Sequence, residues 1–380
     1  MTNKILLTGY IPGINGISTH IHNIYSHLDR NRYDYIFVIP EKHRDDKEEF
    51  KRLKDLDAEI VFLNYSKKDF PKDGRRELKR IMKETPNICG VHAHDVNRSI
   101  YPLLLADSLD LPVKIIQFHA GTSRHMLECI EKNPAEREGI ERIGGARFCR
   151  LACSDLSGRA AYGDLPFEVF PNAVDCKRFA PNLLYRKITR EKLDIPLDSH
   201  VLGFAGYLAE VKNPFFAAEV FVRVHERQPD THMIICGYGK LFDKLRDFFK
   251  EKNLLEYVHF TGEHPQMEFF YNAMDVFLVP SLFEGLPNTV MEAQASGLPC
   301  LVSDRMTEMV CTTDLVKQLS LTEMSDRWVD EAIRLFDERR ERRSYEPELK
   351  KAGFEICDAV EKLMQIYDNQ RCFNMRSSTS

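Results

Sequence analysis

Short apolar runs alternate with amphipathic segments along most of the chain. Runs of Ile, Leu, Val and Phe bounded by polar or glycine-containing turns are typical of buried parallel strands, and the segments between them carry apolar residues at helical spacing. In the first half, the pattern predicts strands at residues 4–9, 35–39, 59–63, 87–93, 113–118 and 150–152. It predicts helices there at residues 17–28, 47–56 and 75–83.

The alternation stops near residue 180 and restarts near residue 200. The predicted strands of the second half are residues 201–205, 232–236, 258–260 and 276–279. Its predicted helices are residues 215–227, 241–252, 266–272, 324–342 and 349–367. Strand–helix alternation favours doubly wound parallel sheets, so we expect an α/β fold with two domains facing across a cleft. We place them at residues 1–179 and 180–345, with a linker in 180–200 and a flexible tail at 368–380.

One stretch, residues 281–299, holds two glutamates, Glu284 and Glu292, with seven residues between them. Pro287 suits the first turn of a helix and Gly297 suits its end. The residues between are mostly apolar, so this helix should be buried and Glu292 should point inward to a partner. Glu284 precedes the positive end of the helix, where anions such as phosphate bind. A loop acid plus an ordinary helix salt bridge is the alternative interpretation.

Glycines follow the predicted strands of the second domain. They occur at Gly206, in Gly237-Tyr238-Gly239 and in Thr261-Gly262, and Lys212 follows the first of them. Glycine lets backbone N–H groups approach a ligand, and a lysine adds positive charge. Each feature alone fits a tight turn or a surface lysine. Together they predict a site for a diphosphate flanked by a sugar and a nucleoside.

The first domain has its own glycine loop, residues 9–16, between a strand and a helix. Its spacing is not G-x-G-x-x-G, so it does not support a dinucleotide site. Gly13 and Gly16 either make a close turn or line a cleft for a sugar or acceptor. Polar residues also follow two strand ends in this domain, where ligands bind in parallel sheets: His92, His94, Asp95, His119, Gly121 and Thr122.

Composition narrows the class of protein. The 380 residues are 43% hydrophobic and 29% charged, and the net charge of −5 does not favour nucleic acid. Ten cysteines without a C-x-x-C pair indicate thiols in a reducing compartment. No leader and no run of about 18 apolar residues is evident, so we expect a cytoplasmic protein.

The segment 67–83 contains eight Lys or Arg residues against three acids. Its apolar side is formed by Leu78, Ile81 and Met82. A solvated outer face would explain this pattern. Docking on the anionic inner face of a membrane is the alternative, which would make the protein peripheral.

The chain resembles the family-4 retaining glycosyltransferases of the GT-B fold, of the bacterial exopolysaccharide and capsule type. The resemblance is carried by Phe-Glu-Gly-Leu-Pro and Glu-Ala-Gln-Ala-Ser-Gly-Leu-Pro within residues 283–299, and by Pro-Asn-Ala-Val-Asp at 171–175. It also includes Lys212-Asn213, Gly237-Tyr238-Gly239 and Thr261-Gly262. It covers nearly the whole chain and is closest over residues 200–300. It implies two Rossmann-like domains, with the helix at 349–367 packing back on the first.

The resemblance implies a role for each matching residue. Glu292 would accept both ribose hydroxyls of the donor, Glu284 would lie by the donor sugar, and Lys212 would neutralise the departing diphosphate. His119 would face the donor sugar from the first domain, and Gly13 and Gly16 would lie in the loop near sugar and acceptor. The remaining donor-binding residues would be Gly206, Tyr207, Gly237, Tyr238, Gly239, Gly262, Gly285, Leu286, Pro287, Asn288 and Thr289. Such enzymes need no metal or other cofactor.

Together with the site predicted from the residues, the resemblance implies transfer of a sugar, with retention, from a nucleoside-diphosphate sugar to a growing polysaccharide. We expect a UDP-linked donor and a lipid-linked acceptor. One departure matters: the family usually has arginine where this chain has Tyr207, and tyrosine offers one neutral hydroxyl in place of a charged fork. Losing such a donor can reduce a rate by roughly 10²–10³. A non-catalytic nucleotide-sugar-binding partner of another glycosyltransferase therefore stays an alternative, as does an epimerase using His92, His94 and Asp95.

Overall fold

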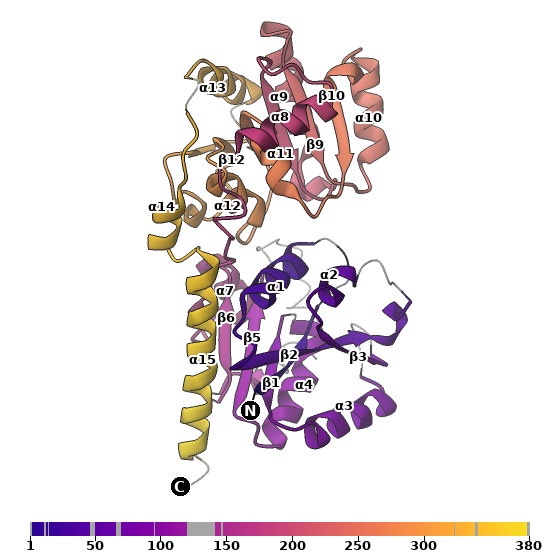
Figure 1. Ribbon diagram of the computed structural model, residues 1–380, viewed down its shortest axis with the longest axis vertical. Helices are drawn as coiled ribbons and strands as arrows, with labels where there is room; N and C mark the ends of the chain where they lie inside the picture. The colour runs from indigo at the N-terminus through magenta and orange to yellow at the C-terminus, as the bar shows by residue number, and fades with distance from the viewer. Residues whose placement is uncertain are drawn as a thin grey trace. The chain divides into compact units, whose positions relative to one another are not determined.

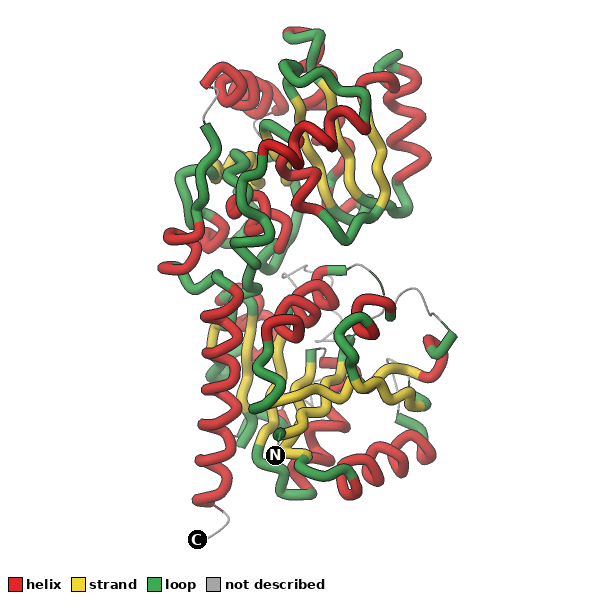
Figure 2. The backbone as a smooth tube through the Cα atoms, in the orientation of Figure 1, coloured by secondary structure: helices red, strands yellow, loops and turns green. Residues whose placement is uncertain are grey.

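The computed structural model describes residues 2–10, 13, 15–45, 50–65, 70–94, 96–119, 141–145, 147–322, 324–338 and 341–377. The chain forms two compact units. Unit 1 comprises Met1–Asn172 together with Ile356–Ser380, and unit 2 comprises Ala173–Glu355. Each unit contains a parallel sheet with helices on it (Figure 1; Figure 2), which confirms the expected α/β class.

Unit 1 is built on a seven-stranded sheet in the order β3-β2-β1-β4-β5-β6-β7. Its strands are β1 (Asn3–Thr8), β2 (Tyr33–Pro40), β3 (Glu59–Leu63), β4 (Ile88–Ala93), β5 (Val113–Phe118), β6 (Cys149–Ala152) and β7 (Glu168–Val169). All their pairings are parallel, with Ile5 of β1 opposite Tyr35 of β2 and Gly90 of β4. Ile5, Leu6 and Leu7 are fully buried because β1 has helices on both faces.

The helices of unit 1 come from both ends of the chain. They are α1 (Gly16–His27), α2 (Lys51–Lys54), α3 (Lys72–Glu84), α4 (Val96–Ser108), α7 (Asp155–Tyr162) and α15 (Ile356–Ser377), with a short 3-10 turn, η1 (Glu41–His43). The last helix packs on α1 and β5, as the resemblance implied, and runs along this unit in Figure 1.

Contacts near the end of α15 explain why it is longer than the predicted 349–367. The hydroxyl of Tyr33 donates to Asp368 at 2.6 Å, and Arg32 pairs with the same carboxylate at 2.8 Å. The helix continues to Ser377, so residues 368–377, which we expected to be a flexible tail, are helical. A separate short helix, α14 (Glu346–Lys351), lies before it in unit 2.

Unit 2 is built on a six-stranded sheet in the order β10-β9-β8-β11-β12-β13, whose named strands also pair in parallel. Its strands are β8 (Val201–Ala205), β9 (His232–Cys236), β10 (Val258–Gly262), β11 (Val276–Val279), β12 (Cys300–Ser303) and β13 (Val316–Leu319). Its helices are α8 (Leu183–Lys192), α9 (Pro214–Arg227), α10 (Phe242–Glu251), α11 (Met267–Ala273), α12 (Asn288–Ala295), α13 (Met324–Glu338) and α14. Its 3-10 turns are η2 (Glu210–Lys212), η3 (Leu255–Tyr257) and η4 (Glu308–Val310).

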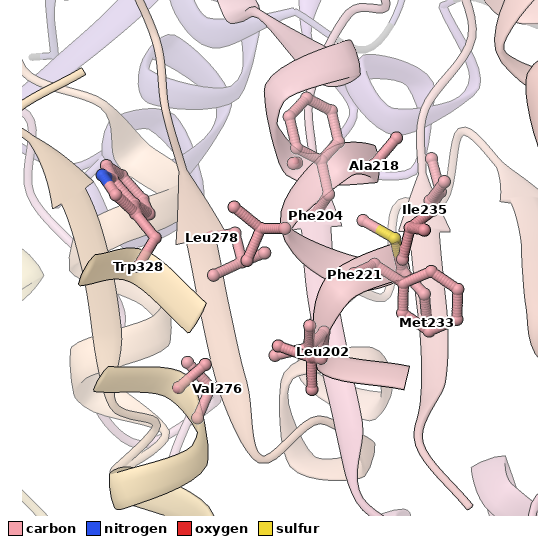
Figure 3. Packing of buried hydrophobic residues seen from close by; sticks show 14 of the residues in the cluster. Leu202, Phe204, Ala218, Phe221, Met233, Ile235, Val276, Leu278 and Trp328 are labelled. Atoms are coloured by element: carbon pink, nitrogen blue, oxygen red, sulfur yellow. The ribbon is translucent and has the colours of Figure 1, made fainter. Parts of the chain in front are cut away.

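The core of unit 2 is formed by the strands and the helices packed on them (Figure 3). Leu202, Met233, Val276, Phe221 and Trp328 are fully buried there, from β8, β9, β11, α9 and α13. Burying one such side chain stabilises the fold by about 1.5–3 kcal/mol. This core fixes the strand ends, and therefore the loops that follow them.

Residues 180–200 are not a linker. Its first half forms α8, which the side chain of Asn182 caps by accepting from the N–H groups of Leu184 and Tyr185. The fully buried guanidinium of Arg190 donates to Asp275 at 2.7 Å and to the carbonyl of Ser199 at 2.7 Å. These bonds make α8 part of unit 2, and the boundary between the units falls at Asn172 and Ala173.

Candidate functional site

The sheet order of unit 2 marks where a ligand should bind. From β8 the chain builds outward to β9 and β10, then crosses to β11, β12 and β13 on the other side. In open parallel sheets a crevice forms at such a switch point, outside the carboxyl ends of the strands. The loops after β8 and β11 carry Lys212 and Glu284. Lys212 and Glu284, both predicted from sequence as site residues, therefore flank the switch point.

Three adjacent strands end in glycines held against one another. Gly206, Gly237 and Gly262 have φ angles of 147°, 138° and 76°, a region that side chains disfavour. The N–H of Gly237 donates to the carbonyl of Gly262 at 2.8 Å. A Cβ on Gly237 would lie 2.0 Å from the carbonyl oxygen of Gly206, and one on Gly239 would lie 2.5 Å from that of Leu208. At these glycine positions the edge of the sheet consequently consists of backbone without side chains.

Two tyrosines stand beside these glycines. Tyr207 follows β8 and Tyr238 follows β9, and both are about half exposed, at 51% and 55%. The carbonyl of Tyr238 accepts from the N–H of Leu208 at 3.0 Å, which ties the two loops together. The ring of Tyr238 packs on that of Phe242 at 5.0 Å. Tyr207 brings a neutral hydroxyl to the loop after β8. The positive charge of this loop comes from Lys212.

Lys212 and Glu284 form an ion pair that sequence reasoning did not predict. The ammonium of Lys212, at the end of η2, donates to Oε1 of Glu284, and the side chains are 28% and 13% exposed. The N–H of Leu282 also donates to the carbonyl of Val211 at 2.8 Å. The β8 and β11 loops are therefore joined by backbone and by charge. The residues are 72 positions apart, so only the fold could bring them together.

The second glutamate lies where the apolar pattern predicted. Helix α12 begins at Asn288 after Pro287 and ends before Gly297, whose φ is 64°. Glu292 is 6% exposed, and its Oε2 accepts from the hydroxyl of the fully buried Tyr271 at 2.8 Å. Burial and the charge of Glu292 raise the pKa of Tyr271 well above its ordinary value, so this hydroxyl keeps its proton.

The remaining predicted donor residues surround the start of α12. Gly285, Leu286 and Pro287 are buried, whereas Asn288 and Thr289 are half-buried. The first N–H groups of a helix have no partner within it, and they carry its partial positive charge. The predicted residues of unit 2 thus gather at one edge of one sheet.

Unit 1 holds the other predicted residues at its own switch point, between β1 and β4. Gly13 has a φ of 101° in the loop after β1, and Gly16 begins α1, where Asn15 caps the N–H of Ser18 at 3.0 Å. His94 follows β4, and its backbone N–H donates to the carbonyl of Thr8 at 2.9 Å. Asp95, Gly121, Thr122 and residues 67–69 lie outside the described residues.

His119 belongs to a cluster of four imidazole rings with His20, His92 and His94. Its Nε2 lies 2.8 Å from Nδ1 of His94, and its Nδ1 lies 3.2 Å from Oδ1 of Asn172. If Asn172 accepts from Nδ1–H, then Nε2 must accept from His94. Both ring nitrogens of His119 are thus engaged within unit 1.

Burial keeps this histidine cluster neutral. It lowers the pKa of His119 to about 4 and that of His92 to about 3, and nearby imidazoles add to the effect at His92. The pKa values of His20 and His94 are also held well below the ordinary value, first by burial and then by neighbouring histidines. At neutral pH this strand end therefore offers polar groups without charge.

The described part of the chain lacks two further features. Among those residues no three His, Cys, Asp or Glu side chains are grouped so as to hold a metal ion. No helix within them is long and apolar enough to cross a membrane.

Residues 186–352, which contain the whole glycine edge and both glutamates, match the family model described as glycosyl transferases group 1. The chain carries a group 1 glycosyltransferase domain. Over nearly its full length this glycosyltransferase is similar to EpsF of Bacillus subtilis, a protein named as a glycosyltransferase. They are 27% identical over 369 residues, 94% of this chain and 95% of EpsF.

A second relative has a name that states its reaction. The UDP-Gal:alpha-D-GlcNAc-diphosphoundecaprenol alpha-1,3-galactosyltransferase of Escherichia coli is 28% identical over 239 residues, 60% of each chain. With EpsF and the family match, it shows that this chain is an enzyme of the glycosyltransferase class. The epimerase and the non-catalytic partner considered from sequence receive no support from these relatives.

Solved structures share the whole architecture. HepE of Anabaena in complex with UDP and glucose aligns over 99% of both chains with a TM-score of 0.68 and 13% identity. A glycosyltransferase from Rickettsia africae aligns over 97% of this chain and 98% of its own, with a TM-score of 0.73 and 15% identity. This likeness shows that the chain has the two-domain GT-B fold predicted from its sequence.

Proposed function

We propose that this glycosyltransferase moves a sugar from a UDP-linked donor to a growing, lipid-linked polysaccharide, with retention at the anomeric carbon. The observation that carries the proposal is the pairing of Lys212 with Glu284 beside a bare glycine edge. A cation and a helix N-terminus meet there beside the glycines, and both are groups that bind phosphate.

The diphosphate would lie along the glycine edge. The N–H groups of Gly206 and Gly237 already donate to the carbonyls of Cys236 and Gly262, so phosphate oxygens would approach this edge beside Lys212, whose side chain lies 3.8 Å from the position that a Cβ on Gly206 would take. Lys212 would neutralise the charge that develops as the nucleoside diphosphate leaves, and the N-terminus of α12 would add its partial charge. No arginine follows Gly206, so the role of Lys212 is correspondingly larger.

The two glutamates would bind different parts of the donor. Glu292 is buried and held by Tyr271, which suits a fixed acceptor for the ribose hydroxyls. Glu284 is half-buried beside Lys212, which suits contact with the sugar next to the diphosphate. Neither needs to act as the nucleophile of a glycosidase. In the reaction we propose, an oxygen of the departing phosphate accepts the proton of the acceptor hydroxyl.

The relatives support the choice of donor and acceptor. HepE binds UDP with glucose, and another similar structure, the pneumococcal O-GlcNAc transferase GtfA, binds UDP with GlcNAc. The acceptor in the name of the Escherichia coli relative is a sugar on diphosphoundecaprenol. We place a comparable acceptor on unit 1, near Gly13, Gly16 and the histidine cluster, where neutral polar groups suit sugar hydroxyls.

A lipid-linked acceptor would bring the enzyme to the inner face of the membrane. Helix α3 is a candidate contact, because it exposes Lys72, Arg75, Arg76, Lys79, Arg80 and Lys83. Arg80 is already paired with Glu77 and Glu84 at 2.6 and 3.0 Å, which reduces the charge available to lipid headgroups. The other basic side chains carry this part of the proposal.

Transfer assays on two variants test the function. A thermal-shift screen over UDP, GDP and ADP sugars first identifies the donor, because a ligand stabilises the state that binds it. Lys212→Ala and Glu292→Ala should each abolish transfer from that donor while the circular dichroism spectrum stays unchanged. Glu210→Gln, an exposed carboxylate on the same turn as Lys212, is the control and should transfer normally. Full activity of either alanine variant would sink the assignment.

A further inference from the structure

We propose that Tyr271 is a positioning residue that orients Glu292 for the paired hydroxyls of the donor's ribose, and so makes the enzyme select ribonucleotides over deoxyribonucleotides. The inference rests on the proposed function, because it assumes that Glu292 is the ribose anchor. Neither the sequence motif nor the family match assigns a role to Tyr271. The geometry of its contact with Glu292 points to this one.

The contact is short, direct and shielded from water. The hydroxyl of Tyr271 lies 2.8 Å from Oε2 of Glu292, Tyr271 is fully buried and Glu292 is 6% exposed. A hydrogen bond to an ionised carboxylate is about twice as strong as one between neutral groups, and it is stronger still away from water. The bond therefore restricts the rotation of the Glu292 carboxylate.

Tyr271 can act as a fixed reference because it is itself held from several sides. Its ring meets those of Phe277 and Phe179 with centroids 5.5 and 5.9 Å away. Its backbone carbonyl accepts from the half-buried guanidinium of Arg342 at 2.8 Å. The next residue, Asn272, accepts from the N–H of Asn182 at 2.7 Å. Helix α11 is thus anchored to β11, α8 and the segment before α14.

Orientation matters because a diol is a two-point ligand. A carboxylate offers about four acceptor positions on two oxygens, and Tyr271 occupies one of them. Two ribose hydroxyls bind well only if the remaining positions point toward both. Without the Tyr271 bond the carboxylate of Glu292 loses one of the contacts that fix its rotation, and it can then turn away from one of the two hydroxyls. Loss of the tyrosine hydroxyl should then weaken the diol more than a ribose that has one hydroxyl.

The test compares UDP with 2′-deoxy-UDP by calorimetric titration of wild type and Tyr271→Phe. Wild type should bind UDP about ten-fold or more tightly than 2′-deoxy-UDP, the effect of one hydrogen bond to a charged group. In Tyr271→Phe this ratio should fall to about two- or three-fold. Both ligands are titrated into one preparation, so a partly unfolded variant lowers the two stoichiometries equally and leaves the ratio meaningful.

Two further variants separate positioning from general damage. Tyr162→Phe removes a buried hydroxyl of unit 1 that donates to the carbonyl of Leu151 at 2.8 Å, and its ratio should equal that of wild type. Glu292→Gln should lose discrimination as Tyr271→Phe does. If wild type discriminates and Tyr271→Phe discriminates equally, the positioning role is overturned while the proposed function stands. If wild type binds UDP and 2′-deoxy-UDP equally, the ribose role of Glu292 is wrong and the inference falls with it.

Discussion

Removing the negative charge of Glu284 should strengthen UDP binding, although we propose that Glu284 contacts the donor sugar during transfer. The carboxylate of Glu284 occupies the ammonium of Lys212 when no donor is bound. A diphosphate must therefore compete with Glu284 for this cation. Glu284→Gln keeps the shape of the side chain and removes its charge, so Lys212 becomes available to phosphate without that competition.

The size of the gain follows from the surroundings of the pair. Two unit charges in contact at an effective dielectric constant near 20 attract one another by about 4 kcal/mol. The side chains are 28% and 13% exposed, and both regain water when the pair opens. That rehydration reduces the net effect to about 1–2 kcal/mol. UDP should therefore bind about ten-fold more tightly to Glu284→Gln.

Isothermal titration of UDP at low and raised salt measures this effect. The difference between wild type and Glu284→Gln should narrow as salt increases, because screening weakens partly exposed charges. Glu210→Gln removes a nearby exposed carboxylate and controls for the general loss of negative charge. Transfer by Glu284→Gln should be lost. UDP affinity equal to or below that of wild type would refute the idea that Glu284 and diphosphate compete for Lys212.

Two other predictions test the strand ends of each unit. Gly237→Ala places a methyl group 2.0 Å from the carbonyl oxygen of Gly206, at a backbone φ of 138°. This variant should therefore have a lower melting temperature and should not bind UDP. Normal UDP binding by a folded variant would contradict the packed glycine edge. The pKa values of about 3 for His92 and 4 for His119 lie below the value near 6.5 of the unfolded chain. Unfolded protein therefore binds more protons as the pH falls from about 6.5 to 4, and stability should drop by up to about 1.4 kcal/mol per pH unit for each histidine. Urea unfolding followed between pH 7.5 and 5 measures this slope, which should be smaller in His92→Gln; a flat profile would contradict the buried neutral cluster.

Much of the framework could be predicted because it is local. Apolar runs with few charges located the central strands, and Pro287 and Gly297 bounded α12 because each has a backbone preference that needs no tertiary contact. The short strands β7, β12 and β13 were missed, since two to four residues leave too little periodicity to detect. The length of α15 was missed because contacts from Tyr33 and Arg32 extend it.

The site was predictable as a set of residues and unpredictable as a set of contacts. The spacing of Glu284 and Glu292 and the glycines after the strands identified which residues to examine. The pairing of Lys212 with Glu284 joins loops after two different strands, and the bond from Tyr271 to Glu292 joins two helices. Such contacts depend on the strand order, β8 next to β11, which no local pattern encodes.

The path of the chain between the units has a mechanical consequence. Unit 2 is inserted into unit 1, so two segments connect them, one at Asn172–Ala173 and one at Glu355–Ile356. Next to those crossings, the N–H of Val174 donates to the carbonyl of Phe354 at 2.8 Å, and Val174 and Glu355 form a parallel bridge. The two connecting segments therefore leave unit 2 side by side, joined by this hydrogen bond and this bridge. A substitution that breaks this bridge would therefore affect both connections between the units at once.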